Sequence, residues 1–525
     1  MNRRHLSVAA LVALGALLAA WSAGGASAAP SGATFTYASQ NSIVTDFDPA
    51  TSYSNEVIAM NNVYEQLTRY DIATKTVKPL LATTWKSGAN GKTWTFTLRK
   101  GVTFHTGRPV TSQAAKAAIE RTIKLKGGPA YIWAAVKSIA TPAPLKLVFH
   151  LKYPAPLDII SSSAYAAYIY DTKASGSQDI KKWFAAAHDA GTGPYVVSTW
   201  KKGQQDELQL SAYEGYWGGW SGKHYTSALF EFVPQPTTQS QLLQSGEVTF
   251  SARLTPQLFS ADRSNGALAT AQRPSFQNLL AMLNTASGPL ADVRVRRAVA
   301  YAIDYAGIVS ALKGSAVAAS GYIPQGLIGY SPSLALKQNV AKAKQLLTQA
   351  GYGSGGKKLA LLLTLANGDA DEALTASIMK SNLAAIGADL KVQMLEWQTQ
   401  WDKGKSTNPA KRQDIFLFYW YPDYADPYSW FINLFHSANP PYFNLSYYTS
   451  KPVDSSIDTL QAKTATSRAK ASATYVSLQR KLLDQAVAVP LYVQNYQRIY
   501  QKSMSGYVDN PSYSNVVFIY NLRPA

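Results

Sequence analysis

The chain has 525 residues, of which 46% are hydrophobic and 12% aromatic, so it is long enough to bury more than one core. This composition excludes an intrinsically disordered chain and a coiled coil. Lys and Arg number 50 against 31 Asp and Glu, a formal charge of +19, although only 15% of the residues are charged. Cysteine is absent, which excludes disulfides, thiolate metal sites, a cysteine nucleophile and a lipid-modified cysteine.

The N-terminal segment has the pattern of a secretory signal peptide. Arg3 and Arg4 give it a positive start, residues 6–18 form an apolar run, and Ala26-Ser27-Ala28 supplies small residues for cleavage. The apolar run is shorter than the ~20 residues that span a bilayer, which favours a removed signal peptide over a membrane anchor. We therefore expect cleavage before Ala29 and export of the remaining chain.

A β-strand is predicted just after Asn90-Gly91. The residues from Trp94 to Leu98 alternate between apolar and polar, which points one apolar face inward. Asn-Gly is a favoured hairpin turn, so the strand is expected to belong to a hairpin. The N-terminal half as a whole is rich in strand patterns and Gly/Pro turns, which is typical of a mixed lobe.

Helical spacing begins behind Asp292, a residue suited to capping a helix. Val295, Val299 and Ile303 repeat at helical intervals, and Arg294, Arg296 and Arg297 are expected on the solvated side. Strands separated by helices imply βαβ units, so residues 273–489 are predicted to form an α/β lobe. Its further predicted elements are helices over 340–350 and 374–386 and strands over 390–394 and 415–420.

The chain lacks the local motifs of common secreted enzymes. It has no Gly-x-Ser-x-Gly elbow, no His-Glu-x-x-His zinc helix and no phosphate-binding loop, and its six histidines are scattered. Gly351, Gly353 and Gly356 match Gly-x-Gly-x-x-Gly, but a helix pattern precedes them and a strand pattern follows, the reverse of a dinucleotide site. We therefore expect no catalytic residues, metal or cofactor, and we interpret the dispersed Lys and Arg as solvated surface.

The segment from Trp85 to Pro109 carries a specific signal. It reads Trp-Lys-Ser-Gly-Ala-Asn-Gly-Lys-Thr-Trp-Thr-Phe-Thr-Leu-Arg-Lys-Gly-Val-Thr-Phe-His-Thr-Gly-Arg-Pro. This closely resembles the signature of the extracellular solute-binding proteins, family 5, which serve dipeptide, oligopeptide and nickel ABC transporters. Six further blocks follow in the order of that family: Gly191–Tyr195, Tyr216–Gly219, Leu243–Glu247, Leu290–Asp304, Ala341–Tyr352 and Trp420–Pro427.

The resemblance implies an α/β fold of the large type II periplasmic-binding-protein class. Two lobes with mixed sheets are joined by a hinge, a ligand is held in the cleft between them, and an extra N-terminal subdomain is attached to the first lobe. The expected division is 1–28 signal peptide, 29–70 lobe I, 71–189 extra subdomain, 190–272 lobe I, 273–489 lobe II and 490–525 a return to lobe I.

The same resemblance implies a soluble component of an ABC importer that captures a di- or oligopeptide without covalent chemistry. The expected partners are this ligand and a membrane permease; nucleic acid is not expected, and we expect a monomer. Many relatives are lipoproteins, so a chain without cysteine is predicted to be unanchored in the periplasm or outside the cell. Nickel chelates, oligosaccharides and opines are alternative ligands, and a secreted hydrolase using Asp423 and Asp426 is the alternative of another class.

Asp423 is the leading candidate for a ligand contact. The resemblance matches it to the position whose carboxylate pairs with a peptide's α-amino group, and a buried ligand charge needs such a counter-charge. The alternative is a turn residue bonded to its own backbone. Asp426, followed by Pro427, is instead predicted to cap a helix, and His436 is interpreted as a packing residue rather than a nickel ligand.

Aromatic side chains complete the candidate site, although the sequence identifies no cation for a ligand carboxylate. Flat rings accept varied ligand side chains, but a buried Trp fills core volume equally well, so both roles stay open for Trp420. The resemblance places seven residues at or near the cleft: Trp420 and Tyr421 after a strand, Tyr131 and Trp133 from the extra subdomain, and Tyr492, Asn495 and Tyr496 at the last crossing between the lobes.

Overall fold

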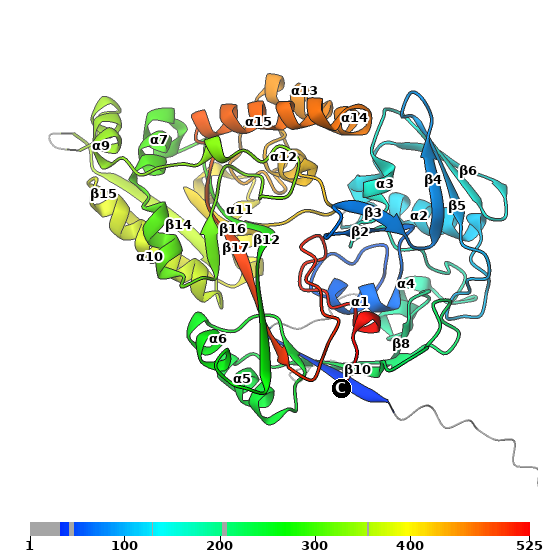
Figure 1. Ribbon diagram of the computed structural model, residues 1–525. Helices are drawn as coiled ribbons and strands as arrows, with labels where there is room; N and C mark the ends of the chain where they lie inside the picture. Colours follow the sequence, from blue (N-terminus) through cyan, green and yellow to red (C-terminus); the bar gives the residue numbers. More distant parts are fainter. Residues whose placement is uncertain (1–31, 41–46, 129, 202–206, 354–355) are drawn as a thin grey trace, which may run out of the picture.

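The computed structural model describes residues 32–40, 47–128, 130–201, 207–353 and 356–525. The predicted signal peptide lies outside these residues, so its prediction stands as made from the sequence. The chain forms two lobes, with an additional subdomain packed beside the first (Figure 1). Within the described ranges, no helix is long and apolar enough to cross a membrane.

Two long antiparallel strands, β12 (Leu268–Leu283) and β17 (Ala488–Gln501), run from one lobe to the other (Figure 1). Their pairing register shifts between Pro274 and Asn278. Proline has no N–H to donate, so the ladder is interrupted at this point of the crossing. The boundaries expected at 272/273 and 489/490 fall within these two strands, and their exact positions stay predictions.

Lobe I forms one side of an 11-stranded sheet, and its core is aromatic. Phe35 and Tyr37 of β1 pack against Phe230 and Phe250 from the neighbouring strands. The sheet has the order β15-β14-β16-β12-β17-β11-β1-β10-β9-β8, with β13 paired to β17. The elements of lobe I are β1 (Ala33–Ser39), α1 (Val57–Val63), β8 (Tyr195–Lys201), β9 (Glu207–Ala212), β10 (Tyr225–Phe232), α5 (Pro236–Ser245), β11 (Phe250–Ser251), α6 (Pro256–Asp262) and the 3₁₀ turn η5 (Ile519–Asn521).

The extra subdomain contains a four-stranded antiparallel sheet of order β4-β5-β7-β6. The hairpin predicted at Asn90-Gly91 is confirmed, because β4 pairs with β5 and Gly91 has the positive φ of +65° that such a turn requires. The elements of this region are β2 (Thr68–Asp71), β3 (Thr76–Pro79), β4 (Ala82–Ser87), β5 (Thr93–Leu98), α2 (Ser112–Leu125), the 3₁₀ turn η1 (Ala130–Trp133), β6 (Val136–Ala143), β7 (Lys146–Leu151), α3 (Leu157–Ile160) and α4 (Ile180–Ala185).

Lobe II contains the predicted βαβ arrangement. Strands β14 and β15 are parallel and joined by α10, and β16 lies parallel to β14 on the other side. Its strands are β13 (Ala316–Ala318), β14 (Leu359–Ala366), β15 (Ala388–Leu395) and β16 (Ile415–Trp420). Its helices are α7 (Val293–Ala302), α8 (Tyr305–Ala311), α9 (Val340–Gln349), α10 (Ala370–Ala384), α11 (Trp397–Gly404), α12 (Tyr428–Leu434), α13 (Lys451–Asp458), α14 (Leu460–Thr466) and α15 (Arg468–Asp484), with 3₁₀ turns η2 (Pro289–Ala291), η3 (Pro332–Leu334) and η4 (Pro409–Lys411).

Helix α7 confirms one prediction and corrects another. The Asp292 carboxylate accepts a hydrogen bond from the backbone N–H of Arg294, as the capping prediction requires. The prediction that Arg296 is solvated is wrong, because its side chain is only 4% exposed. Burial lowers the pKa of this guanidinium, which is satisfied by donating to three backbone carbonyls, those of Leu290, Ala291 and Gln485.

Glu65 is a buried carboxylate that joins two of the sequence blocks. It accepts hydrogen bonds from Thr192 Oγ1 at 2.9 Å, Tyr216 OH at 3.1 Å and Trp217 Nε1 at 2.9 Å. Burial raises the pKa of Glu65, and these hydrogen bonds and the nearby charge of Arg69 oppose the increase. The Gly-Thr-Gly-Pro-Tyr and Tyr-Trp-Gly-Gly blocks are therefore explained by one internal cluster.

The two glycines beside Thr192 allow this cluster to form. A Cβ on Gly191 would lie 2.0 Å from the Val63 carbonyl oxygen, and one on Gly193 would lie 2.5 Å from the Asn62 carbonyl oxygen. Only glycine permits the backbone to approach α1 so closely. The block thus has a structural role in lobe I.

Candidate ligand-binding cleft

A cavity of about 270 Å³ lies between the two lobes and is called the cleft cavity below. Lobe I contributes residues 37–40 at the end of β1 and residues 252–253 after β11. Lobe II contributes Asp369 after β14 and residues around the end of β16, while β17 supplies residues 494–498. Because both lobes form its wall, any separation of the lobes enlarges this cavity.

Three of the predicted site residues line the cleft cavity: Tyr421, Asn495 and Tyr496. Tyr421 stacks on Tyr165 of the extra subdomain, with ring centroids 6.2 Å apart and planes inclined by 26°. Tyr165 also lines the cavity, so the two rings form a flat part of its wall. A wall of this kind accepts ligand side chains of different shapes.

Asp423 lies just behind this wall, where lobe I, lobe II and the extra subdomain meet. Its carboxylate accepts hydrogen bonds from Tyr53 OH at 3.3 Å and from Tyr131 OH, and its backbone carbonyl accepts from Ser163 Oγ at 2.6 Å. The Tyr53 ring contacts Tyr165 with centroids 5.2 Å apart. Tyr53 therefore links the carboxylate to a ring of the cavity wall.

The surroundings of Asp423 make its negative charge costly. The residue is 1% exposed, and burial raises its pKa to about 7, opposed by the Tyr53 hydrogen bond. In the described part of the chain, no Lys, Arg or His side chain forms an ion pair with it. A cation brought to this carboxylate would replace its proton and remove the cost of an uncompensated buried charge.

Tyr131 reaches Asp423 from the subdomain, near the position that the resemblance implied. It lies in η1, donates its phenol hydrogen to the Asp423 carboxylate and accepts a hydrogen bond from Asn433 Nδ2 at 2.8 Å. Asn433 belongs to α12 of lobe II, so this chain of polar contacts spans two parts of the molecule. Tyr131 thus orients the carboxylate without lining the cleft cavity itself.

The three remaining candidates lie in hydrophobic cores. Trp133 stacks on Phe149 and donates to the Ala166 carbonyl, and Trp420 packs against Phe443. Tyr492 is fully buried and shares a hydrogen bond of 2.7 Å with Tyr419 OH. Their large apolar surfaces are removed from water by packing, so the structure gives no support for ligand contact by them.

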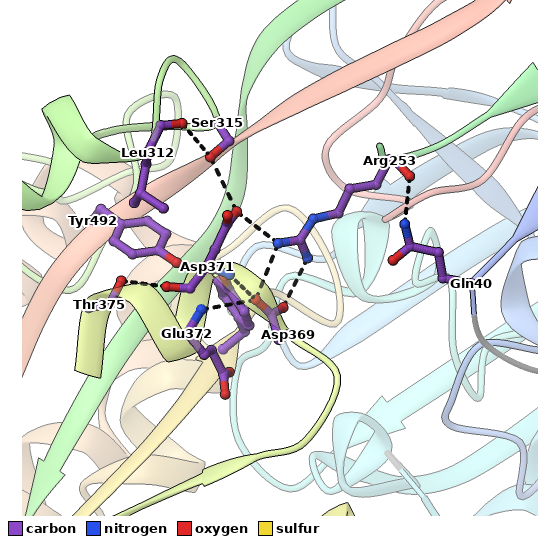
Figure 2. A network of polar contacts seen from close by, with 10 residues as sticks. Gln40, Arg253, Leu312, Ser315, Asp369, Asp371, Glu372, Thr375 and Tyr492 are labelled. Atoms are coloured by element: carbon purple, nitrogen blue, oxygen red, sulfur yellow. Dashed lines mark hydrogen bonds and ion pairs between the residues drawn. The ribbon is translucent and has the colours of Figure 1, made fainter. Parts of the chain in front are cut away.

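Sequence reasoning missed two arginines at the cleft, Arg253 and Arg498, of which Arg498 is buried and paired with Asp509. Arg253 lines the cavity, and its guanidinium contacts the carboxylates of Asp369 and Asp371 at the start of α10 (Figure 2). Asp369 lies 116 residues from Arg253 in the sequence, so no local pattern connects them. The local sequence carries one related signal, Asn367-Gly368-Asp369 before an apolar helical pattern. This signal predicts that Asp369 caps a helix, but it does not predict that Asp369 meets Arg253.

The described residues give little support for the metal and dinucleotide sites that local motifs could suggest. Among the residues described, no group of three His, Cys, Asp or Glu side chains is arranged to hold a metal ion. His436 lies 3.2 Å from Asp458 on the surface of lobe II. Gly351, with φ of +83°, follows the C-cap residue Ala350 of α9, which agrees with a helix-ending loop rather than a dinucleotide site.

Asp426 has the structural role expected of it. Its carboxylate accepts from the backbone N–H of Tyr428 at 2.8 Å and from Tyr475 OH at 2.7 Å. Helix α12 begins at Tyr428, one residue later than the start predicted at Pro427. Both interactions lie in the core of lobe II, so the carboxylate stabilises the start of α12.

A family model matches residues 76–442, more than half of the chain; its description is bacterial extracellular solute-binding proteins, family 5. This chain belongs to that family. The probable D,D-dipeptide-binding periplasmic protein DdpA of Escherichia coli is 27% identical over 490 residues, covering 89% of this chain and 90% of DdpA. Membership establishes the solute-binding class that the sequence resemblance implied.

Solved structures of similar proteins confirm the two-lobed fold. The Helicobacter pylori periplasmic binding protein DppA, solved with the peptide STSA, superposes with a TM-score of 0.80 at 20% identity and covers 94% of this chain and 98% of that one. The murein tripeptide binding protein MppA of Escherichia coli gives 0.77 at 21% identity, covering 94% and 99%. An unliganded open form of MppA gives a TM-score of 0.69 at 21% identity, covering 94% of this chain and 98% of that one.

Proposed function

We propose that this chain is the binding component of an ABC importer and captures a short peptide by its amino end between the two lobes. The observation that carries the proposal is Asp423, a buried carboxylate at the meeting point of both lobes and the subdomain, for which the described part of the chain supplies no cationic partner. A peptide α-amino group supplies the missing positive charge. Similar proteins named for dipeptides and solved with peptides support this ligand class.

The route to Asp423 passes the tyrosines of the cavity wall. Tyr53 contacts both Asp423 and Tyr165, so a rotation of its side chain would connect the carboxylate with the cleft cavity. The peptide's amino end would then replace the Tyr53 hydroxyl at the carboxylate, while Tyr421 and Tyr165 contact its first side chains. Tyr131 would keep the carboxylate oriented through its own hydrogen bond.

The remaining parts of the proposal follow from family membership. Binding proteins of this kind release the solute to a membrane permease, and the chemical work belongs to the ATPase of that complex. We propose that the chain acts as a monomer without catalysis, outside the cytoplasmic membrane after removal of its signal peptide. Lobe closure would present the loaded form to the permease.

Native mass spectrometry of the protein purified from rich medium, followed by denaturing release of any bound solute, tests this function. The expected result is a retained peptide with a free amino terminus and no cleavage when peptide and glycan mixtures are added. Retention of a nickel chelate, an oligosaccharide or an opine would replace the ligand class but keep the transport role. Turnover of any added substrate would contradict both.

A further inference from the structure

The cleft holds an ion-pair cluster that joins the two lobes. Arg253 directly follows β11 of lobe I, while Asp369 and Asp371 stand at the start of α10 in lobe II. Arg253 Nη1 lies 3.0 Å from Asp369 Oδ2, and Arg253 Nη2 lies 3.3 Å from Asp369 Oδ1 and 2.8 Å from Asp371 Oδ2 (Figure 2). The planar guanidinium therefore binds two carboxylates of the opposite lobe.

The carboxylates of this cluster are held in place within lobe II, and the backbone of Arg253 is held within lobe I. Asp369 Oδ1 accepts from the backbone N–H groups of Asp371 and Glu372 at 2.9 and 3.0 Å, and Asp371 Oδ2 accepts from Ser315 Oγ at 3.2 Å. On lobe I, the backbone carbonyl of Arg253 accepts from Gln40 Nε2 at 3.1 Å (Figure 2). Carboxylates fixed in advance lose little side-chain entropy when the lobes meet, which strengthens the ion pairs.

The charges favour contact over separation. Without Arg253, two carboxylates would face each other at the start of α10, and Glu372 beside them has its pKa raised by burial and by the charge of Asp369. Burial also raises the pKa of Asp371, and Arg253 opposes that increase. One guanidinium close to two acidic groups thus relieves a repulsion that exists within lobe II alone.

A contact between lobe II and the extra subdomain is much weaker and gives a comparison. Arg468 of α15 lies 3.8 Å from Asp158 of α3, and its side chain is 52% exposed. The side chains of Arg253 and Asp371 are 37% and 8% exposed and make shorter contacts. Exposed pairs at such a distance contribute little because water and salt screen them, so the Arg253 cluster is better placed than this pair to influence closure.

We propose that Arg253, Asp369 and Asp371 form a cross-lobe latch that populates the closed arrangement of the lobes before any ligand binds. The latch sets the fraction of ligand-free protein that is closed. A ligand then shifts this existing equilibrium further toward the closed form. The inference goes beyond the proposed function because it concerns the ligand-free chain and holds for any ligand class. It also means that Arg253 is already occupied and is not a vacant anchor for a ligand carboxylate.

Single-molecule energy transfer on ligand-free full-length protein tests the latch. The absence of cysteine allows dyes on Lys223→Cys in lobe I and Lys380→Cys in lobe II, both at exposed positions. Arg253→Met should reduce the closed-to-open ratio about tenfold, and 1 M salt should reduce it in the unsubstituted protein. Asp371→Asn, altered from the other lobe, should act in the same direction, and Arg468→Met should leave the ratio unchanged.

A double-mutant cycle completes the test. Arg253→Met combined with Asp369→Asn should lower the ratio by less than the product of the two single effects, because both remove the same contact. A ligand-free closed-to-open ratio that Arg253→Met changes by less than twofold would overturn the latch. If Arg253→Met weakens only ligands with a carboxylate and leaves that ratio alone, Arg253 is a ligand anchor and the latch is wrong. Neither outcome bears on the amino-end proposal at Asp423.

Discussion

Glu65 and Asp423 are two buried carboxylates that accept hydrogen bonds from neutral donors, yet their settings differ. Glu65 lies inside the cluster formed by Thr192, Tyr216 and Trp217, with the charge of Arg69 nearby. Asp423 lies at the junction of the lobes with tyrosine hydroxyls on its carboxylate and no charged partner among the residues that the structure describes. Burial alone therefore does not mark a binding residue, and we expect a ligand at the carboxylate that lies between the lobes rather than at the one enclosed in lobe I.

The largest effect is expected at the structural carboxylate. Glu65→Ala leaves three buried donors without an acceptor, which should lower the free energy of unfolding by roughly 5 kcal/mol. Urea denaturation measures this loss. The control is Glu120→Ala, because Glu120 is half exposed and lies 3.8 Å from Lys116, so little change is expected. A loss below about 1 kcal/mol for Glu65→Ala would remove the contrast between the two carboxylates.

The next effect concerns Asp423 and pH. Its pKa is raised from 3.8 to about 7, so between these values the folded protein holds a proton that the unfolded chain has released. The contribution of Asp423 to the free energy of unfolding therefore falls as the pH rises from 3.8 to about 7, by roughly 4 kcal/mol in total. Asp423→Asn cannot ionise and should escape the loss. Denaturation of both proteins from pH 4 to pH 8 should show the variant gaining relative stability, and parallel curves would contradict the raised pKa.

Gly193 tests the backbone beside the Glu65 cluster. Gly193→Ala places a Cβ 2.5 Å from the Asn62 carbonyl oxygen, a backbone atom that cannot move aside cheaply. Overpacking of this kind should cost about 2 to 3 kcal/mol of unfolding free energy. Gly266→Ala is the matched control, since its Cβ would meet nothing within 4 Å. Equal melting temperatures for the two variants would show that the close approach is unimportant.

The smallest effect is expected at Tyr131. Tyr131→Phe removes one hydrogen bond to the Asp423 carboxylate and should cost about 1 kcal/mol at pH 8, where that group is ionised. The loss should shrink at pH 5, because a protonated carboxyl needs the donor less. Tyr301→Phe, with a ring 39% exposed, provides the control in the same denaturation series. A cost that does not depend on pH would mean that Tyr131 packs without orienting Asp423.

The sequence predicted features that depend on neighbouring residues, and it missed contacts between residues that are far apart in the chain. The hairpin at Asn90-Gly91 and the βαβ unit of lobe II follow from turn chemistry and from the spacing of apolar residues along single segments. The solvation of Arg296 was misjudged because distant backbone carbonyls, such as that of Gln485, satisfy it. Such partners come from tertiary packing and leave no mark on the helical pattern.

The candidate site could be predicted from the sequence to about the same extent as the fold. Tyr421, Asn495 and Tyr496 line the cleft cavity, but periodicity cannot decide whether an aromatic residue such as Trp420 or Tyr492 faces a ligand or a core. Arg253 and Asp369 meet because the segments that follow β11 and β14 come together between the lobes. Whether Asp423 binds an amine stays a prediction that binding experiments decide.

Calorimetry of peptide binding at pH 6 in buffers of different ionisation enthalpy tests the central claim most directly. Asp423 is mostly protonated at this pH, so a charged α-amino group should displace about one proton on binding. The same peptide with an acetylated amino end should bind about 100-fold more weakly and release none, as should the free peptide with Asp423→Asn. Equal affinity and equal proton release for the free and acetylated peptides would contradict the account.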